Sequence, residues 1–259
     1  MRKLVVFGDS YVEGQRKDPH LMITKYNPCY YLEKELGVEV INNGKFGSGN
    51  QAIANEVLRY CRKHGGENTA ILVVWSDIKR NAELNLKMEK ERIFDFDDWQ
   101  YVSSGSGSKE HLRLLMPEFR NPAFHRMWFE QSMHTVRMVC QDYGIPLLMT
   151  SSIDSNPLLN KVHYQKRDRY IDFCMSKAKE QWIEGYNPNN SMLDIITNRW
   201  LKKDISDLTY EKKHTIIRND YKRNKSKYPY LTNCFHPWDE GNELIAKTLA
   251  PYIKPILEK

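Results

Sequence analysis

The first candidate for chemistry is Ser10, in the segment Gly8-Asp9-Ser10. It comes directly after a short apolar run at residues 4–7, which is the pattern of a strand buried on both faces. A serine on a tight turn at the end of a strand has an accessible hydroxyl, and its backbone N–H is directed into the same cleft. A nucleophile needs both features. A turn or a helix cap explains the segment equally well, because Asp and Ser favour both.

Two further clusters hold groups that such a serine would need. Residues 42–50 are rich in glycine, and backbone amides there are suited to hydrogen-bond a developing oxyanion. His236, followed by Pro237, precedes the last predicted helix, where its ring is placed to take the proton of Ser10 as a general base. Taken singly, the first cluster is a plain strand-to-helix loop and His236 a surface or core residue. Neither the dinucleotide fingerprint nor a GK[ST] loop accompanies the glycines, so a phosphate loop is not predicted.

The elements that must position these residues alternate along the chain. Continuous apolar runs predict strands at residues 4–7, 38–41, 70–75 and 145–149, and helical periodicity predicts helices at 28–36, 50–64, 123–143 and 239–250. Pro251 and Pro255 are expected to limit the last helix. This alternation is typical of an α/β protein with a parallel sheet. Sites in such sheets lie at the carboxyl ends of the strands, where the three clusters fall.

Composition narrows the class of protein. The chain has 259 residues, of which 41% are hydrophobic and 28% charged, so disorder, collagen and coiled coil are excluded. No apolar run approaches the roughly 18 residues of a membrane-spanning helix. The apolar start is also shorter than the roughly 7–15 residues of a signal-peptide core, so a protein that is cytoplasmic or otherwise without a cleaved signal peptide is expected.

The cysteines and histidines indicate no metal or disulfide framework. The cysteines are odd in number and widely spaced, without a CxxC pair, and the histidines form no HxH or HExxH pattern. They are Cys29, Cys61, Cys140, Cys174 and Cys234. The sequence therefore predicts neither a metal nor a cofactor, and it favours a reducing compartment.

Two segments interrupt the alternation, at about residues 79–122 and 155–232. The first holds an acidic aromatic stretch and a Ser/Gly run at 103–108, and the second is long and rich in Lys and Arg. We interpret both as insertions in one domain spanning residues 1–259. The net charge of +6 belongs mainly to the second insertion. A solvated insertion is a plainer explanation for its basic tracts than nucleic-acid binding, because no nucleic-acid motif is present.

The three clusters together resemble the motif blocks of the SGNH/GDSL hydrolase superfamily. Residues 8–14 match the first block, GDS-x-x-x-G, completely, and Asn42 and Gly47 match the second, N-x-x-x-x-G. His236 matches the histidine of the last block, D-x-x-H. The resemblance implies a flavodoxin-like three-layer α/β/α sandwich. It also implies that Ser10 is the nucleophile, that the N–H groups of Ser10 and Gly47 are oxyanion donors, and that His236 is the general base.

The third block departs from the family pattern. Where the family has G-x-N-D, whose asparagine amide completes the oxyanion hole, this chain reads Trp75-Ser76-Asp77-Ile78. Asp77 is the nearest positional match, but an ionised carboxylate cannot donate a hydrogen bond. Ser76, Arg80 or Asn81 are alternative donors. Loss of one oxyanion donor typically costs about 10²–10³ in rate. A block of this W-S-x-x-x-R kind is similar to those of phage or bacterial members.

The last block also departs, because Asn233 stands where the family has aspartate. The Asn233 carbonyl is able to hold the histidine tautomer but supplies no charge, and the analogous change for a serine nucleophile costs about 10⁴. A backbone carbonyl, Asp239 or Glu240 are alternative partners for the histidine, and Asp239 is predicted instead as a helix cap. Ser10, His236 and Asn233 are therefore the predicted catalytic set.

These observations predict a serine esterase that cleaves a small-molecule or glycan ester. Aromatic residues suited to stacking on sugar rings favour carbohydrate O-deacetylation; they are Trp99, Tyr101, Trp182, Trp200 and Trp238. The two departures leave open a binding or assembly module that has kept the fold and lost catalysis. An acyltransferase is a third possibility.

Overall fold

A computed structural model supplies the structure of the protein. It describes residues 2–14, 16–18, 21–23, 27–76, 80–84, 99–103, 122–152, 191–202, 208, 210–223 and 236–258. Predicted features at Asp77, Trp182 and Asn233 lie outside these residues, and so do most of the two predicted insertions. Among the described residues no helix is long and apolar enough to cross a membrane.

The centre of the molecule is a parallel sheet of four strands in the order β4-β1-β5-β8. The strands are β1 (Lys3–Gly8), β4 (Val40–Gly44), β5 (Thr69–Trp75) and β8 (Leu147–Ser151). Every residue of β5 is buried, as its continuous apolar run predicts. Every residue of β8 is also buried, but this strand begins and ends two residues later than the predicted 145–149. The order in which strands are added to the sheet reverses at β1, because β4 is added on one side of β1 and β5 on the other.

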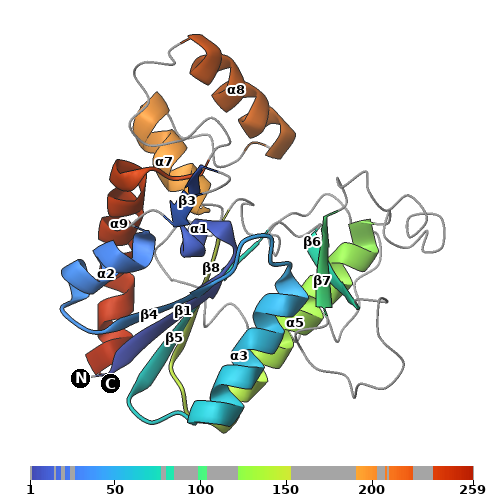
Figure 1. Ribbon diagram of the computed structural model, residues 1–259, viewed down its shortest axis with the longest axis vertical. Coiled ribbons are helices and arrows are strands. Elements are labelled where there is room, and N and C mark those ends of the chain that lie inside the picture. Colours follow the sequence, from blue (N-terminus) through green and yellow to red (C-terminus); the bar gives the residue numbers. More distant parts are fainter. Residues whose placement is uncertain are drawn as a thin grey trace.

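Helices cover both faces of this sheet (Figure 1). One face packs against α2 (Pro28–Leu36) and α9 (Asp239–Glu258), and the other against α3 (Asn50–His64) and α5 (Pro122–Asp142). Alternate residues of β1 serve the two cores: Leu4 and Val6 face α2 and α9, whereas Val5 and Phe7 face α3 and α5. The predicted three-layer α/β/α sandwich is thereby confirmed.

The last helix extends further than its prolines predict. It runs through Pro251 and Pro255 to Glu258, instead of ending near Ala250. Its buried stripe explains this, since side chains at four-residue spacing continue into the core to the end; they are Ile245, Leu249, Ile253 and Leu257. Both prolines are on the exposed side, where water can satisfy the carbonyls that lose their helical donors.

Strand β4 also differs from the prediction of residues 38–41. It begins at Val40 and continues to Gly44, through residues expected to form a closing turn. The backbone pairing with β1 extends to this end, with Asn43 opposite Phe7 and Gly44 opposite Gly8. Polar side chains are tolerated because β4 is at the edge of the four-stranded sheet and its residues are only half buried.

Part of the predicted second insertion belongs to the core. Helix α7 (Met192–Leu201) begins at a capping box formed by Ser191 and Asp194 and buries Met192 and Ile196 in the α2–α9 core. Helix α8 (Tyr210–Arg223) adds Ile217 to it. The sequence does not predict this packing, because the polar average of the segment hides short amphipathic stretches. In the basic tract at the end of α8, Arg218 and Arg223 are exposed.

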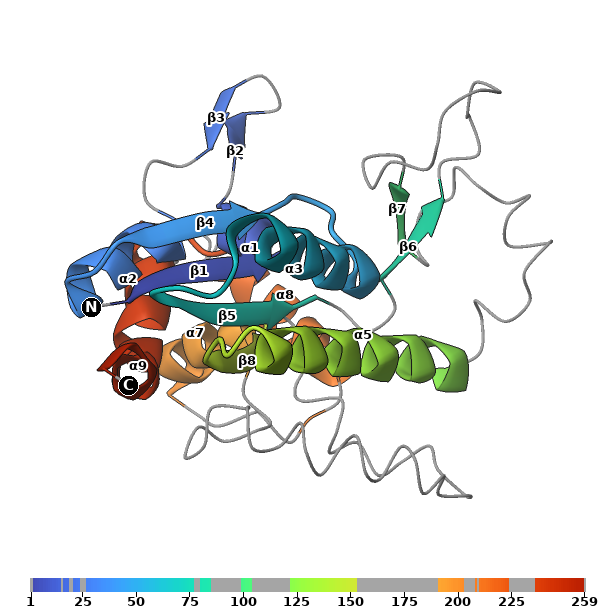
Figure 2. The same cartoon turned by 90° about the horizontal axis from the view of Figure 1, so that it is seen from below.

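Two antiparallel hairpins project from the same side of the molecule (Figure 2). One pairs β2 (Arg16–Asp18) with β3 (Leu21–Ile23), and the other pairs β6 (Arg80–Leu84) with β7 (Trp99–Ser103). The second hairpin lies in the predicted first insertion and had no periodic signal strong enough to predict it.

Candidate active site

The candidate nucleophile lies where the sheet order reverses. Ser10 follows β1, and Ser76 follows the adjacent strand β5, so both are at the carboxyl edge at the switch point of the sheet. A short helix, α1 (Ser10–Glu13), begins at Ser10 and is capped by Asp9, whose Oδ1 accepts from Tyr11 N at 3.0 Å. As the first residue of a helix, Ser10 has a backbone N–H without an intrahelical acceptor.

Ser10 and His236 are in direct contact. Ser10 Oγ is 2.7 Å from His236 Nε2, although 226 positions separate the two residues in the sequence. In the tautomer that a general base requires, the hydroxyl donates and Nε2 accepts. The histidine ring lies against two aromatic rings, with centroid distances of 5.3 Å to Tyr11 and 6.4 Å to Phe46. The structure therefore brings together the two residues predicted as nucleophile and base.

Asp9 connects the ends of three strands beneath this pair. Its side chain is fully buried, and its Oδ2 accepts from Ser76 Oγ at 2.6 Å and from Ser152 Oγ at 3.1 Å. Ser76 follows β5 and Ser152 follows β8. The sequence predicts a local turn role for Asp9, which the bond to Tyr11 N confirms. The two serine contacts join strands far apart in the sequence and had no local signal.

Gly47 sits in a turn whose geometry requires glycine. Ser48 N donates to Lys45 O at 3.1 Å, and Gly47, the third residue of this turn, has a φ of 78°. A positive φ at this position is the mark of a type II turn and favours glycine. A Cβ at Gly47 would meet nothing within 4 Å, so the requirement comes from the backbone alone.

Three contacts fix this turn beside α1. The Glu13 carboxylate accepts from Phe46 N, and Asn42 Nδ2 donates to Val12 O at 2.8 Å. Gly44 N donates to Asn42 Oδ1, also at 2.8 Å. Helix α1 and the Gly47 turn therefore form one hydrogen-bonded unit, in which Asn42 joins the two.

Neither donor of Ser76 is available to an oxyanion. Its hydroxyl has a single proton, which it donates to Asp9, and its backbone N–H donates to Asn50 Oδ1 at 2.9 Å. Asn50, at the start of α3, in turn donates from Nδ2 to Ser76 O at 3.4 Å. Ser76 therefore positions the end of β5.

The remaining predicted site residues are only partly described. Asp77 and Asn233 lie outside the described residues, and Arg80 and Asn81 are described only as backbone of β6. Asp239 begins α9, in its acidic first turn, as a residue near a helix N-terminus should. In the part of the chain that the structure describes, no group of three or more His, Cys, Asp or Glu side chains is placed to hold a metal ion.

Three residues of the site were not predicted from the sequence, namely Asn50, Glu13 and Phe46. Asn50 and Glu13 act through hydrogen bonds to backbone far along the chain, which leave no local pattern. Phe46 had a weak signal, an aromatic residue in a glycine-rich loop, and the structure shows it 64% exposed beside His236.

Comparisons with known proteins give matches only among solved structures. No protein-family model and no curated protein matches the chain. It is similar to TesA, with 12% identity over 98% of this chain and 99% of the other and a TM-score of 0.49. A member of the lipolytic protein G-D-S-L family from Veillonella parvula matches at 11% identity over 97% of both chains, with a TM-score of 0.42.

A third solved structure is an acetylxylan esterase from Geobacillus stearothermophilus, with 11% identity over 100% of this chain and 94% of the other and a TM-score of 0.41. At this level of similarity the neighbours say nothing about the substrate of this chain. The chain itself resembles a divergent SGNH/GDSL hydrolase, in its motif blocks and in the three-layer fold.

Proposed function

We propose that the protein is a serine esterase of the SGNH/GDSL type. The observation that carries the proposal is the 2.7 Å contact between Ser10 Oγ and His236 Nε2 at the carboxyl edge of the sheet. A serine and a histidine in this contact form the nucleophile–base pair of acyl transfer. A purely structural pair would gain little from a position at the switch point, where parallel sheets bind their ligands.

The reaction proceeds through an acyl-enzyme. His236 accepts the Ser10 proton as Oγ attacks the ester carbonyl, and the oxygen of the tetrahedral intermediate takes the negative charge. His236 then gives its proton to the leaving alcohol, and a water activated by the same ring hydrolyses the acyl group. The N–H groups of Ser10 and Gly47 stabilise the oxyanion, each worth about 10²–10³ in rate.

The substrate class we propose is an O-acetylated carbohydrate. Phe46 supports this, because it presents an exposed ring beside His236 where a sugar face would stack. Of the aromatic residues predicted for this role, Trp238 is half-buried just before α9, and Trp200 is half-buried on α7. Trp99 and Tyr101 belong to β7, and Trp182 lies outside the described residues.

Covalent labelling tests the proposed nucleophile. A fluorophosphonate probe is expected to form an adduct on Ser10, and Ser10→Ala and His236→Gln should each abolish labelling and hydrolysis of p-nitrophenyl acetate. Ser132→Ala is the matched control, since Ser132 is a buried serine on α5 whose hydroxyl donates to Trp128 O. Folded wild-type protein that takes up no probe and cleaves no acetyl ester would point instead to a binding module. Acyl transfer to added alcohols, with little hydrolysis, would indicate an acyltransferase.

A further inference from the structure

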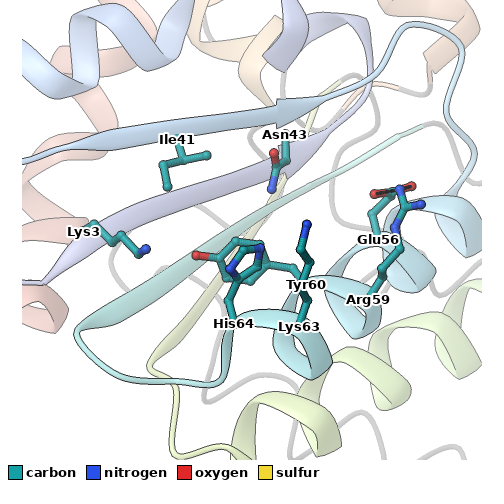
Figure 3. Close-up of a pocket in the computed structure, with 8 residues that line it drawn as sticks. All are labelled: Lys3, Ile41, Asn43, Glu56, Arg59, Tyr60, Lys63 and His64. Carbon is teal, nitrogen blue, oxygen red and sulfur yellow. Dashed lines mark hydrogen bonds and ion pairs between the residues drawn. The ribbon is translucent and has the colours of Figure 1, made fainter.

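A hollow lies away from the Ser10–His236 pair, between the edge strand β4, the start of β1 and helix α3 (Figure 3). Its volume is about 470 Å³, within the usual range of small-molecule sites. We call it the α3 groove. Ile41 forms part of its wall, and Asn43 contributes an amide; both side chains are on the α3 face of β4. Neither Ser10 nor His236 lines it.

The charge of the α3 groove is positive. Lys3 and Lys63 both line it, and within the described part of the chain neither ammonium group has a carboxylate within 4.0 Å. The one carboxylate in the lining, Glu56, is already bound by Arg59 at 2.5 Å and by Lys45 at 2.7 Å. These bonds outweigh the effect of burial and hold the Glu56 pKa below its ordinary value, so its charge is compensated within the protein.

Tyr60 supplies an independent observation that points to a ligand. The residue is only 9% exposed, and its hydroxyl has no hydrogen-bond partner among the described residues. The ring is held between Phe7, at 5.7 Å, and His64, at 4.7 Å, so the hydroxyl is fixed in place. Figure 3 shows it directed across the groove toward Lys3. A buried hydroxyl without a partner is costly, and a ligand oxygen beside Lys3 would satisfy it.

We propose that the α3 groove binds a small organic phosphate, such as a sugar phosphate. The phosphate would lie between Lys3, Lys63 and the Tyr60 hydroxyl, where two cations and a fixed neutral donor match a dianion with several acceptor oxygens. The ring pair of Tyr60 and His64 and the side chain of Ile41 would contact the organic portion. This site is independent of the proposed esterase reaction, because it shares no residue with it.

Calorimetric titration of the full chain with ribose 5-phosphate, inorganic phosphate and ribose tests the proposal. Ribose 5-phosphate should bind with a dissociation constant in the millimolar range or better, inorganic phosphate more weakly, and neutral ribose not at all. Lys63→Gln should weaken binding at least fivefold. Arg62→Gln is the matched control, since Arg62 is the exposed neighbour on the same helix and does not line the groove. The Ser10→Ala variant should bind as wild type does.

Tyr60→Phe separates a ligand-binding role from a structural one. It should weaken binding at least threefold without lowering the melting temperature, because the hydroxyl that it removes has no partner to lose. Absence of saturable binding below about 10 mM would overturn the proposal. So would equal losses for Lys63→Gln and Arg62→Gln, which would indicate a diffuse charge effect. A lowered melting temperature with unchanged affinity for Tyr60→Phe would assign that hydroxyl to the fold.

Discussion

Replacement of Asp9 by alanine tests the connection between the strand ends and the nucleophile. The change removes a fully buried carboxyl group that accepts from Tyr11 N, Ser76 Oγ and Ser152 Oγ. Two buried serine hydroxyls and one helix N–H would then lose their acceptor at once. Because α1 begins at the next residue, the loss falls directly beneath Ser10.

The magnitude follows from these three contacts. A buried hydrogen bond contributes about 1 ± 0.5 kcal/mol, and a donor left unsatisfied costs about 1–3 kcal/mol. Asp9→Ala should therefore lower the free energy of unfolding by about 3–4 kcal/mol. Ser76→Ala should cost only about 1 kcal/mol, because Asp9 keeps its other two donors. Asp9→Asn should fall between these values, since the amide retains one acceptor oxygen.

Urea unfolding followed by tryptophan fluorescence measures these differences, with the free energy obtained by linear extrapolation. The rate of ester hydrolysis, measured without urea at a temperature where each variant is folded, gives the effect on the site. We expect Asp9→Ala to lower this rate at least tenfold. An Asp9→Ala variant no less stable than Ser76→Ala would refute the idea that Asp9 holds three strand ends together.

Three further changes concern the Gly47 turn and its surroundings. Gly47→Ala should lower the free energy of unfolding by about 1–2 kcal/mol, because φ is 78° and no side-chain contact offsets the strain. It should also lower kcat/KM for p-nitrophenyl acetate at least tenfold. An unchanged kcat/KM would exclude Gly47 as an oxyanion donor. Phe46→Ala should leave the free energy of unfolding within about 0.5 kcal/mol of wild type, since the ring is 64% exposed. It should raise KM severalfold for an acetylated xylan but not for p-nitrophenyl acetate, whereas Phe46→Trp should raise neither. Glu56→Gln should lower stability at neutral pH by about 0.5–1 kcal/mol. Because the Glu56 pKa is lowered in the folded state, this difference should begin to shrink as the pH falls through about 4.5 and should vanish only below the folded-state pKa. Thermal melts measure it, and a constant difference would contradict the pairing with Lys45 and Arg59.

The strands and the core helices were predictable because their signals are local and repeated. The apolar run at residues 70–75 of β5 and the helical face of α3 give such signals, and Gly37, a glycine in the left-handed conformation, ends α2. The end of α9 was not predictable, because the balance between two exposed prolines and a buried stripe depends on the tertiary packing of that stripe.

The site divides in the same way. Ser10, Gly47 and His236 stand in motif blocks, and each follows or precedes a regular element, so sequence and spacing indicate them. The roles of Asn50 and Ser76 arise from mutual hydrogen bonds between the ends of different strands and helices. Such bonds depend on which strands become neighbours in the sheet. The pattern of residues along one sequence does not show which strand ends lie side by side. The same limit explains why Ser76 was predicted as an oxyanion donor when its proton is given to Asp9.

The long sequence separation of Ser10 and His236 has a consequence for the order of events during synthesis. Ser10 begins α1 directly after β1 and is synthesised 226 positions before His236, which precedes α9 on the α2 face of the sheet. The strands β1, β4 and β5, which pair directly with one another, are all complete once residue 75 has been made. During translation of the next 160 or so residues, Ser10 lacks its proposed base and the Leu4–Val6 face lacks α9. The contact between Ser10 and His236 and the packing of α9 on that face therefore form in the same late step, when α9 docks.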